Sequence, residues 1–333
     1  MAKHILSCDW GSTSFRLRLV ERTDKKVLSE VLTDEGIIYT FNAYQAIIAN
    51  RQVSRKQYFL ERLTQSLSTL ADSSAIDISN LDIIISGMAS SSIGMYELPY
   101  ADLPFATDGS QAGLKVFEAE DSFQHRIILI SGVKSQVDVA RGEETQLIGL
   151  IKLLKLNTHT ETIFILPGTH SKHLQIKEDR LVDIQTFMTG ELYNILTHHS
   201  ILRDSVDVDT KGEMSDDDRK AFIKGVRNSA SANILNRLFT VRTNQLFQKL
   251  DKKQNAHYLS GLLIGNELAG LLKSEYVPLI LCSGGALHTL YRLAFECLGL
   301  LNRTTIVSAD AINQATIAGQ IIIAQNNNAF YED

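Results

Sequence analysis

Near its start the chain reads Cys8-Asp9-Trp10-Gly11-Ser12-Thr13-Ser14-Phe15-Arg16. An apolar run over residues 4–8 leads into this stretch, and an alternating run over residues 15–20 leads out of it. Both runs are typical of β-strands, so we expect a hairpin that carries a carboxylate at the end of its first strand. Gly11 allows the backbone to turn tightly and to approach a ligand closely. The fold that we infer begins at this hairpin.

The turn of this hairpin has groups suited to an anion and to a cation. Successive main-chain N–H groups over Gly11, Ser12 and Thr13 would form an anion-binding concavity. The Asp9 carboxylate beside them would hold a divalent cation through water. Because Asp-x-Gly also occurs in ordinary hairpins, this pattern alone leaves a plain turn open.

Composition limits the class of protein. The chain has 333 residues, enough for one large or two ordinary domains, and its 44% hydrophobic and 21% charged residues are typical of a globular protein. A net charge of -5 and the lack of a long basic run argue against a nucleic-acid surface. No apolar run is long enough for a membrane span.

Cysteine usage and the start of the chain bear on its compartment. Cys8, Cys282 and Cys297 have neither metal-ligand spacing nor a disulfide pattern. The first residues lead directly into a strand and lack the apolar region of a signal peptide. We therefore expect a protein of the reducing cytoplasm.

Strands and helices alternate along the chain, which predicts an α/β protein. The first half is expected to contain strands at 5–8, 15–20, 26–32, 81–85 and 127–130, and helices at 57–70 and 143–156. The second half is expected to contain strands at 162–166, 173–177, 181–187, 279–282 and 305–307, and helices at 191–202, 258–272, 286–298 and 311–324. A long loop rich in serine and glycine follows the fourth strand, and long ordered loops are often functional.

The two halves share one pattern, although their sequences show no detectable identity. Each half opens with a strand, a turn of glycine and hydroxyl residues, and a second strand. We place the boundary in the polar stretch 157–160, which gives an N-terminal domain over 1–157 with a substrate loop. The C-terminal domain, 158–330, would carry the nucleotide site and a charged helical insertion over 203–250. Within that insertion, Ser215 followed by Asp218 predicts a capping box.

The second half has a turn of the same kind as the first, Pro167-Gly168-Thr169-His170-Ser171-Lys172, after an apolar strand. One such turn in each half favours phosphate binding over two plain hairpins. Facing each other across a cleft, the two turns would hold the β- and γ-phosphates of a nucleotide, and Lys172 would add a positive charge. No P-loop and no dinucleotide-binding glycine motif occurs.

Three further segments have both a structural and a functional interpretation. Glu143 and Glu144 open a helix, where acidic side chains stabilise the helix dipole by about 0.3–1 kcal/mol. Arg141 lies two residues before Glu143, which favours a catalytic carboxylate that takes a proton from a substrate hydroxyl; the residues do not decide which glutamate it is. Thr189-Gly190-Glu191 is either a helix start or a set of groups for a polyol. Gly284-Gly285 is either a short connection or a surface for a flat ring.

Several segments together resemble the 2-dehydro-3-deoxygalactonokinase family. They are Asp9–Thr13, Gly87-Met88 with Pro99-Tyr100, Arg141–Gly149, Pro167–Lys172, Met188–Leu192 and Leu259–Gly265. The resemblance covers nearly the whole chain, and the Arg-Gly-Glu-Glu-Thr-Gln and Pro-Gly-Thr-His segments are specific. It implies two ribonuclease H-like domains, of the type found in hexokinase and actin, with an interdomain cleft.

The resemblance also implies a reaction and a set of site residues. ATP and Mg²⁺ would be used to phosphorylate the C6 hydroxyl of 2-dehydro-3-deoxy-D-galactonate in galactonate breakdown. The first phosphate motif matches Asp9, Gly11, Ser12 and Thr13, the second matches Gly168, Thr169 and His170, and the adenosine motif matches Gly284 and Gly285. Substrate contacts are expected from Gly87, Met88, Arg141, Glu143, Thr189, Gly190 and Glu191.

Within this set, Asp9 would hold Mg²⁺, and Glu143 or Glu144 would deprotonate the attacking hydroxyl. Arg141 would bind the substrate carboxylate or the developing phosphoryl charge, since a guanidinium binds either in a bidentate manner. Met95 and His173 stand where tryptophan is expected in this family.

Other functions on the same fold are left open. They are a kinase for another sugar or sugar acid, a nucleotide-binding switch or filament protein, and a phosphatase that acts on phosphoanhydrides. Turnover of ATP that depends on a sugar acid would distinguish the first class from the others. We expect small-molecule ligands, neither nucleic acid nor membrane as partner, and the sequence leaves a homodimer open.

Overall fold

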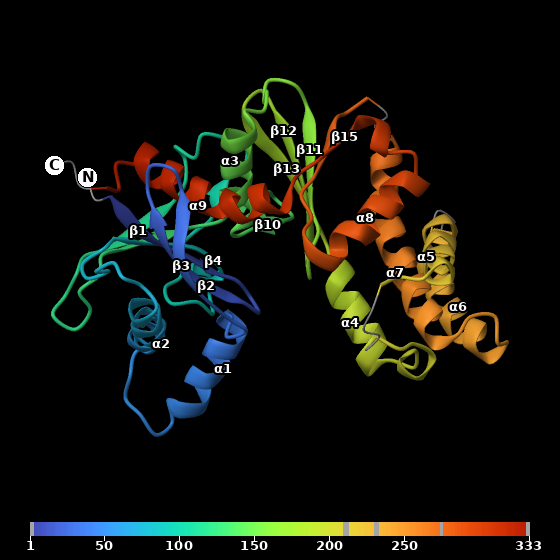
Figure 1. Cartoon of the computed structure of the whole chain (residues 1–333), viewed down its shortest axis with the longest axis horizontal. Helices are drawn as coiled ribbons and strands as arrows, with labels where there is room; N and C mark the ends of the chain where they lie inside the picture. The colour runs from blue at the N-terminus through green and yellow to red at the C-terminus, as the bar shows by residue number, and fades with distance from the viewer. Residues whose placement is uncertain (1–2, 209–212, 230–232, 274–275, 331–333) are drawn as a thin grey trace. The chain divides into compact units, whose positions relative to one another are not determined.

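The computed structural model describes residues 3–208, 213–229, 233–273 and 276–330. Contacts divide the chain into two compact units. Unit 1 comprises Met1–Thr160, Gln175–Ile184 and Asp310–Asp333, and unit 2 comprises Glu161–Leu174 and Gln185–Ala309. Figure 1 labels the elements of both units along the chain.

Unit 1 contains a six-stranded sheet with the order β3-β2-β1-β4-β8-β7. Its strands are β1 (His4–Trp10), β2 (Phe15–Glu21), β3 (Lys26–Thr33), β4 (Ile83–Gly87), β7 (Leu114–Phe117) and β8 (Ile127–Ile130). The first three are antiparallel neighbours, whereas β4 is parallel to β1 and β8 is parallel to β4. The opening strands and the two buried strands that the sequence predicts are thus confirmed. A small sheet of β5 (Ala101–Asp102), β9 (Val133–Lys134) and β10 (Val139–Ala140) was not predicted.

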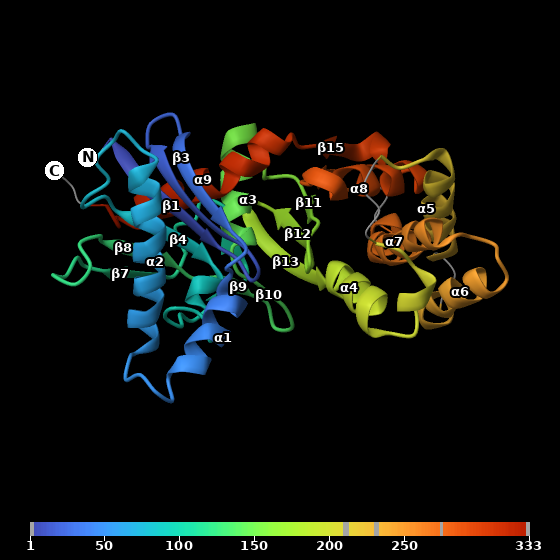
Figure 2. The same cartoon turned by 60° about the horizontal axis from the view of Figure 1, so that its bottom comes forward.

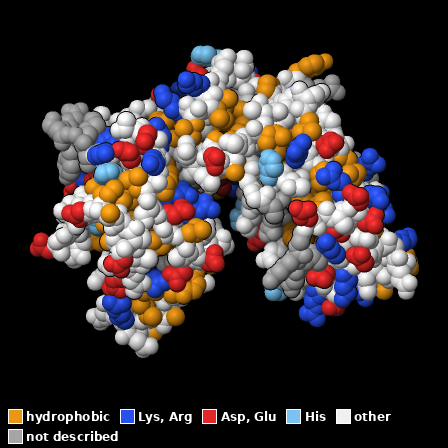
Figure 3. Space-filling view, in the orientation of Figure 1, with side chains coloured by type: hydrophobic (Ala, Val, Ile, Leu, Met, Phe, Trp, Pro, Cys, Tyr) orange, Lys and Arg blue, Asp and Glu red, His pale blue; other side chains and the backbone are white. Residues whose placement is uncertain are grey.

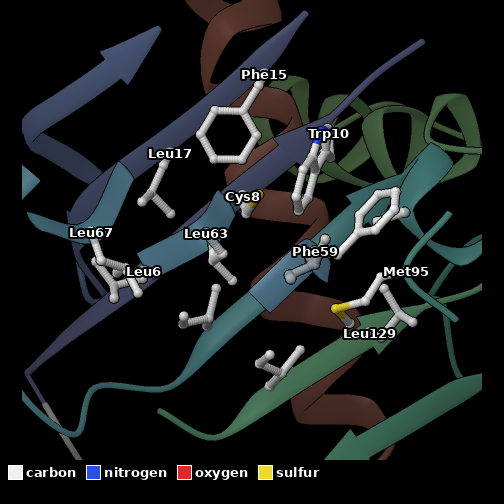
Figure 4. Close-up of a cluster of buried hydrophobic side chains, with 14 of the residues drawn as sticks. Leu6, Cys8, Trp10, Phe15, Leu17, Phe59, Leu63, Leu67, Met95 and Leu129 are labelled. Atoms are coloured by element: carbon white, nitrogen blue, oxygen red, sulfur yellow. The ribbon is translucent and has the colours of Figure 1, made fainter. Parts of the chain in front are cut away.

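One face of this sheet is covered by α2 (Arg55–Asp72), whose apolar stripe matches the predicted helix. Figure 4 shows Phe59 and Leu63 of α2 among the side chains of Trp10 and its neighbours on β1 and β2. The Trp10 ring contacts Phe59 with a centroid distance of 5.3 Å. The sequence analysis did not predict α1 (Ile37–Ile47), because its apolar residues follow no helical stripe; its buried residues are Ile37 and Thr40.

The other face of the sheet is contacted by α9 (Ala309–Asn326). Side chains alternate along a strand, so Ser7 points away from the α2 face. The side chain of Gln320 on α9 accepts the Ser7 hydroxyl at 2.6 Å and donates to the Cys8 carbonyl at 2.8 Å. These bonds explain why contacts assign α9 to unit 1, whereas the sequence-based division placed it in the C-terminal domain. The first segment of unit 1 ends at Thr160, close to the boundary expected over 157–160.

Two glycines allow α9 to cross α3 (Glu143–Leu154) at very short range. A Cβ atom on Gly319 would lie 1.8 Å from the Thr145 carbonyl oxygen, and one on Gly149 would lie 1.8 Å from the Ala315 carbonyl oxygen. Real side chains cannot occupy such space, so both positions require glycine.

Gly319→Ala is therefore expected to lower the free energy of unfolding by about 3 kcal/mol, because the helices must separate or shift. Gly270→Ala is the matched control, since a Cβ atom there meets no described atom within 4 Å. We expect the control to change stability by less than about 0.5 kcal/mol. Urea unfolding measures both, and equal midpoints for the two variants would contradict the close crossing.

A second six-stranded sheet has the order β15-β14-β11-β12-β13-β6. Its strands are β6 (Phe105–Ala106), β11 (Thr162–Leu166), β12 (Ser171–Lys177), β13 (Arg180–Phe187), β14 (Leu279–Leu281) and β15 (Thr304–Ile306). As in the first sheet, β14 is parallel to β11 and β15 is parallel to β14. The order β13-β12-β11-β14-β15 thus repeats β3-β2-β1-β4-β8, which confirms the predicted pair of ribonuclease H-like folds.

The helices of unit 2 include the pair α5 (Asp216–Ser229) and α7 (Lys252–Leu268), which lie side by side (Figures 1 and 2). A Cβ atom on Gly261 would lie 2.2 Å from the Phe222 carbonyl oxygen, so this pair also depends on glycine. The other helices are α4 (Thr189–His199), α6 (Ile234–Leu246) and α8 (Gly285–Cys297). Four short 3₁₀ turns complete the described elements, at Met88–Ser90, Arg203–Ser205, Ala269–Lys273 and Leu301–Arg303.

The predicted insertion over 203–250 contains the 3₁₀ turn Arg203–Ser205 and the helices α5 and α6, and its other described residues are not helical; residues 209–212 and 230–232 lie outside the described residues. The predicted capping box is confirmed, because Ser215 and Asp218 each accept the main-chain N–H of the other, at 3.2 and 3.0 Å. Among the described residues, no helix is both long and apolar enough to cross a membrane. Figure 3 shows basic and acidic side chains interspersed over the visible face.

Candidate active site

The first predicted turn closes the β1–β2 hairpin, as expected. The Gly11 N–H donates to the Ser14 carbonyl at 2.9 Å, and Asp9 lies one residue before the end of β1. In the described part of the chain, no acceptor is found for the main-chain N–H groups of Ser12 and Thr13. Both groups are therefore available to an anion.

Asp9 lies between charged neighbours of both signs. It is in register with Arg16 on β2 and with Ser86 on β4. Burial raises the pKa of Asp9, the Arg16 and Arg18 guanidiniums oppose that rise, and the Glu143 carboxylate adds to it.

A cation beside Asp9 would offset the cost of this burial. Mg²⁺ is typically bound by one or two carboxylates together with substrate phosphates and water. The described residues contain no group of three or more His, Cys, Asp or Glu that could enclose a metal ion. Asp9 thus fits an ion that is shared with a phosphate ligand.

Two glycines bring the start of α3 next to Asp9. Gly87 ends β4 with φ +89°, and a Cβ atom there would lie 2.8 Å from the Trp10 carbonyl oxygen and 3.5 Å from Asp9 Oδ1. Gly142 precedes α3 with φ +111°, and its Cβ atom would lie 3.2 Å from the Gly87 Cα. The absence of both side chains lets the ends of β1 and β4 and the start of α3 converge. Met88 follows Gly87 and packs against the hydrophobic core.

The two glutamates at the start of α3 have different surroundings. Glu144 is 2% exposed; its carboxylate accepts the Gly142 N–H at 2.7 Å and the Thr145 hydroxyl at 2.9 Å. Burial, followed by the Glu143 charge, raises the pKa of Glu144 to about 7. Glu143 is half-buried, accepts the Arg141 N–H at 2.9 Å, and acts electrostatically on Asp9. Glu143 is thus the more accessible carboxylate.

The raised pKa of Glu144 predicts a pH-dependent stability. Its ionised form is disfavoured in the folded state, so the stability present below pH 4.5 is lost as pH rises through 7. A rise in pKa from 4.5 to about 7 corresponds to about 3 kcal/mol. The free energy of unfolding of Glu144→Gln, relative to that of wild type, should therefore rise by up to about 3 kcal/mol from pH 4 to pH 8. Unfolding curves at both pH values measure this change.

The control for this measurement is Glu97→Gln, a substitution at an exposed position. Its stability should differ from wild type by a similar amount at both pH values. If Glu144→Gln behaved like this control, Glu144 would not be held in a protonated form by the fold.

Arg141 holds the loop after β4. Its guanidinium donates to the carbonyl and hydroxyl of Ser90 and, at 3.3 Å, to the Leu98 carbonyl, and it lies 4.0 Å from the centre of the Tyr100 ring. The side chain is buried, and its Nε finds no partner among the described residues. These contacts indicate a structural role for Arg141, and its predicted contact with substrate stays a prediction.

The second predicted turn lies against the start of α4 in unit 2. The Glu191 N–H donates to the Thr169 carbonyl at 3.0 Å, and a Cβ atom on Gly190 would lie 2.7 Å from the Gly168 carbonyl oxygen. The His170 imidazole bonds to the Glu191 carboxylate. The structure therefore brings together two segments that the sequence analysis treated separately.

Main-chain donors are also available at this second turn. The Gly168 N–H donates to the Ser171 hydroxyl oxygen at 3.3 Å. For the N–H groups of Thr169 and His170, the described residues provide no acceptor. The Lys172 ammonium is buried and donates to the His170 carbonyl at 3.3 Å.

The glycine pair at the start of α8 is exposed. Gly284 is the N-cap residue, and Gly285 has φ +58°, a conformation that favours glycine. A Cβ atom on either residue would meet no described atom within 4 Å, so the backbone is open to a flat ring.

A nearby cavity of about 180 Å³ lies between α4, α7 and α8, and largely apolar side chains line it. Its lining includes Gly168, Gly190, Leu263, Leu287 and Tyr291.

The sequence analysis missed a buried carboxylate in unit 2. Glu267 on α7 is 3% exposed; it accepts the Tyr291 hydroxyl at 2.7 Å and the Thr189 hydroxyl, and lies 3.2 Å from His173 Nε2. Glu267 is the single acidic residue of the helix predicted at 258–272, and this is the signal that would have found it, because a buried charge needs partners.

Two residues noted for their position in the family are buried. Met95 lies in the core of unit 1 near Phe59 and Leu129, as Figure 4 shows. His173 is enclosed between Glu267 and the Phe187 ring, at a centroid distance of 4.6 Å from the latter. Met95 therefore packs in the core of unit 1, whereas His173 is a buried polar partner of Glu267 in unit 2.

Known proteins are similar to this chain over almost its whole length. Residues 9–321 match the family described as 2-keto-3-deoxy-galactonokinase. The chain belongs to this family. This confirms the resemblance and the predicted class of enzyme, a kinase that acts on a sugar acid.

Individual relatives agree with this membership. The chain is 33% identical over 322 residues to a probable 2-dehydro-3-deoxygalactonokinase of Rhizobium meliloti (strain 1021), covering 95% of this chain and 96% of the relative. It is 32% identical over 246 residues to 2-dehydro-3-deoxygalactonokinase of Escherichia coli (strain K12), covering 71% and 76%. A crystal structure of a candidate 2-dehydro-3-deoxygalactonokinase from Sinorhizobium meliloti matches with a TM-score of 0.76 and 32% identity. The match covers 99% of this chain and 98% of that chain.

Proposed function

We propose that this member of the family transfers the γ-phosphoryl group of ATP, with Mg²⁺, to the C6 hydroxyl of 2-dehydro-3-deoxy-D-galactonate. The observation that carries the proposal is the convergence of Asp9, Gly87 and the start of α3 at one point of unit 1. It supplies a carboxylate for a cation and a second carboxylate for a hydroxyl. Free main-chain donors at the adjacent turn suit the transferring phosphoryl group.

In unit 1, Asp9 would hold Mg²⁺, which neutralises charge on the phosphates when it is bound. Ser12 and Thr13 would donate main-chain N–H groups to a phosphate. Glu143 would orient and deprotonate the attacking hydroxyl, because access to substrate is the first requirement of a base and Glu143 is more exposed than Glu144. Glu144 would hold the start of α3 through its bonds to Gly142 and Thr145.

The loop after β4, held by Arg141, would contribute to the sugar-acid site together with Gly87. Arg141 would then act on substrate through the position of this loop, or directly if the loop opens.

In unit 2, the turn over Gly168–Lys172 would bind phosphate through the N–H groups of Thr169 and His170. Gly284 and Gly285 with the adjacent apolar cavity would receive the adenosine part. The proposal assigns substrate binding to the N-terminal domain and nucleotide binding to the C-terminal domain. Exclusion of water around the transferring phosphoryl group would limit wasteful hydrolysis of ATP.

The test is ATP consumption by the purified protein against a panel of 2-keto-3-deoxy acids. We expect Mg²⁺-dependent ADP formation that requires the galactonate-derived acid, with phosphorus on C6 of the product by NMR. Phosphate release without an acceptor would indicate a phosphatase, and nucleotide-dependent assembly without turnover would indicate a switch protein. The cytoplasmic location and the homodimer stay predictions, and fractionation and sedimentation would test them.

A further inference from the structure

We infer that Glu267 is a positioning residue for the phosphate-binding turn of unit 2, an inference that rests on the proposed function. Glu267 is almost completely buried, yet both of its carboxylate oxygens have partners. These partners come from three different elements: His173 on β12, Thr189 at the start of α4, and Tyr291 on α8. One carboxylate thus connects the elements that surround the turn.

A chain of hydrogen bonds with a defined direction leads from the turn to Glu267. The Tyr291 hydroxyl donates to the Glu267 carboxylate at 2.7 Å. Having used its one proton, Tyr291 can only accept from the Ser171 hydroxyl, which lies 3.0 Å away and is also 3.5 Å from the Gly168 carbonyl oxygen. The Ser171 oxygen in turn accepts the Gly168 N–H at 3.3 Å. Burial and then the Glu267 charge raise the pKa of Tyr291, so its hydroxyl keeps the proton that this direction requires.

This chain affects which main-chain groups can face a ligand. Because the Gly168 N–H is directed inward to Ser171, the following N–H groups, of Thr169 and His170, are those left for an anion. The second contact of Glu267, with the Thr189 hydroxyl, holds the residue just before Gly190. Gly190 lies close to the Gly168 carbonyl, since a Cβ atom on Gly190 would come within 2.7 Å of that oxygen. Glu267 is therefore linked to the turn through Tyr291 and Ser171, and to the segment packed against the turn through Thr189, without being part of it.

The experiment compares the affinities of each variant for a non-hydrolysable ATP analogue and for adenosine. Glu267→Gln removes the negative charge and leaves one acceptor oxygen, so the bonds donated by Tyr291 and Thr189 lose their charge assistance, or their acceptor where the amide NH2 faces them. Tyr291→Phe keeps the ring and removes the link to Ser171. For both variants, we expect the analogue to bind about ten-fold more weakly while adenosine binding changes less than about two-fold, as loss of a charge-assisted bond predicts.

A kinetic readout and a matched control separate positioning from general loss of stability. Both variants should raise KM for ATP and lower kcat without changing KM for the sugar acid. Leu259→Ala, in the buried core around α7, is the control, because it leaves a cavity but touches none of these bonds. It should leave the ratio of the two affinities as in wild type.

The results have distinct meanings. If the folded Glu267 variant keeps the wild-type ratio of affinities, or loses both ligands equally, the inference is overturned. The double variant should bind the ATP analogue no more weakly than the single variant with the lower affinity, since both substitutions act through one chain of hydrogen bonds. Strictly additive losses of binding free energy would also count against the inference. A wild-type protein that prefers neither ligand would overturn the phosphate site itself. Normal nucleotide binding without sugar-acid turnover would contradict the proposed reaction alone.

Discussion

Glu143→Gln should lower kcat by about 10²–10⁴-fold, the range expected when a general base is removed. The substitution keeps the shape of the side chain and can keep the bond from the Arg141 N–H, so the start of α3 should stay folded. KM for ATP should change little, because this carboxylate acts on the acceptor hydroxyl. Steady-state turnover with the sugar acid, together with an unfolding curve, measures both effects.

Glu144→Gln is the comparison that decides between the two glutamates. Glu144 is buried and already bonded to Gly142 and Thr145, so it should affect turnover only through the position of the helix start. We expect a loss of about ten-fold or less in kcat, a size typical of an altered hydrogen bond. The pKa of Glu144, at about 7, is nevertheless suited to a base. A larger loss for Glu144→Gln than for Glu143→Gln would therefore exchange the two roles.

Asp9→Asn should lower kcat by about 10²–10³-fold and raise the Mg²⁺ concentration needed for half-maximal turnover, since a cation contributes several kcal/mol to such reactions. The neutral amide cannot balance the charge of a bound ion. The substitution also removes the cost of burying a negative charge beside Glu143, so the variant should not be less stable than wild type. Turnover measured over a range of Mg²⁺ concentrations, at fixed ATP, separates the metal effect from substrate binding.

Asp82→Asn provides the matched control for Asp9. Asp82 lies just before β4, and burial raises the pKa of its carboxyl as it does for Asp9. Unlike Asp9, it forms an ion pair with Arg126. This variant should keep the wild-type Mg²⁺ dependence. If Asp9→Asn kept the same dependence and rate as this control, the cation site would have to lie elsewhere.

Local chemistry was enough to predict the hairpin at Asp9, the turn at Gly168 and most strands and helices. Alternating or continuous apolar runs bounded by glycine turns decide these elements within a few residues of sequence. The repeat of the two halves could be predicted in the same way. Its confirmation in the strand order shows that the two halves share one pattern of elements although their side chains differ.

Elements with weak patterns were missed for an equally physical reason. The α1 helix has apolar residues all round and buries few of them, so it has no periodic signal. The short strands β5, β9 and β10 are each two residues long, too short for a periodic pattern; β9 and β10 pair with each other across a short turn, and β5 pairs with β9. Contacts also assigned α9 to unit 1 through Gln320, a residue more than 300 positions from Ser7.

The sequence by itself determined the α/β class, the two glycine turns, the acidic start of α3 and the family. Each of these depends on residues that are close together in the chain. Only the tertiary structure decided that Glu143 is the accessible glutamate, that Arg141 holds a loop, and that Glu267 is buried with partners from three elements. Those properties depend on burial and on hydrogen bonds between distant segments, which no local pattern specifies.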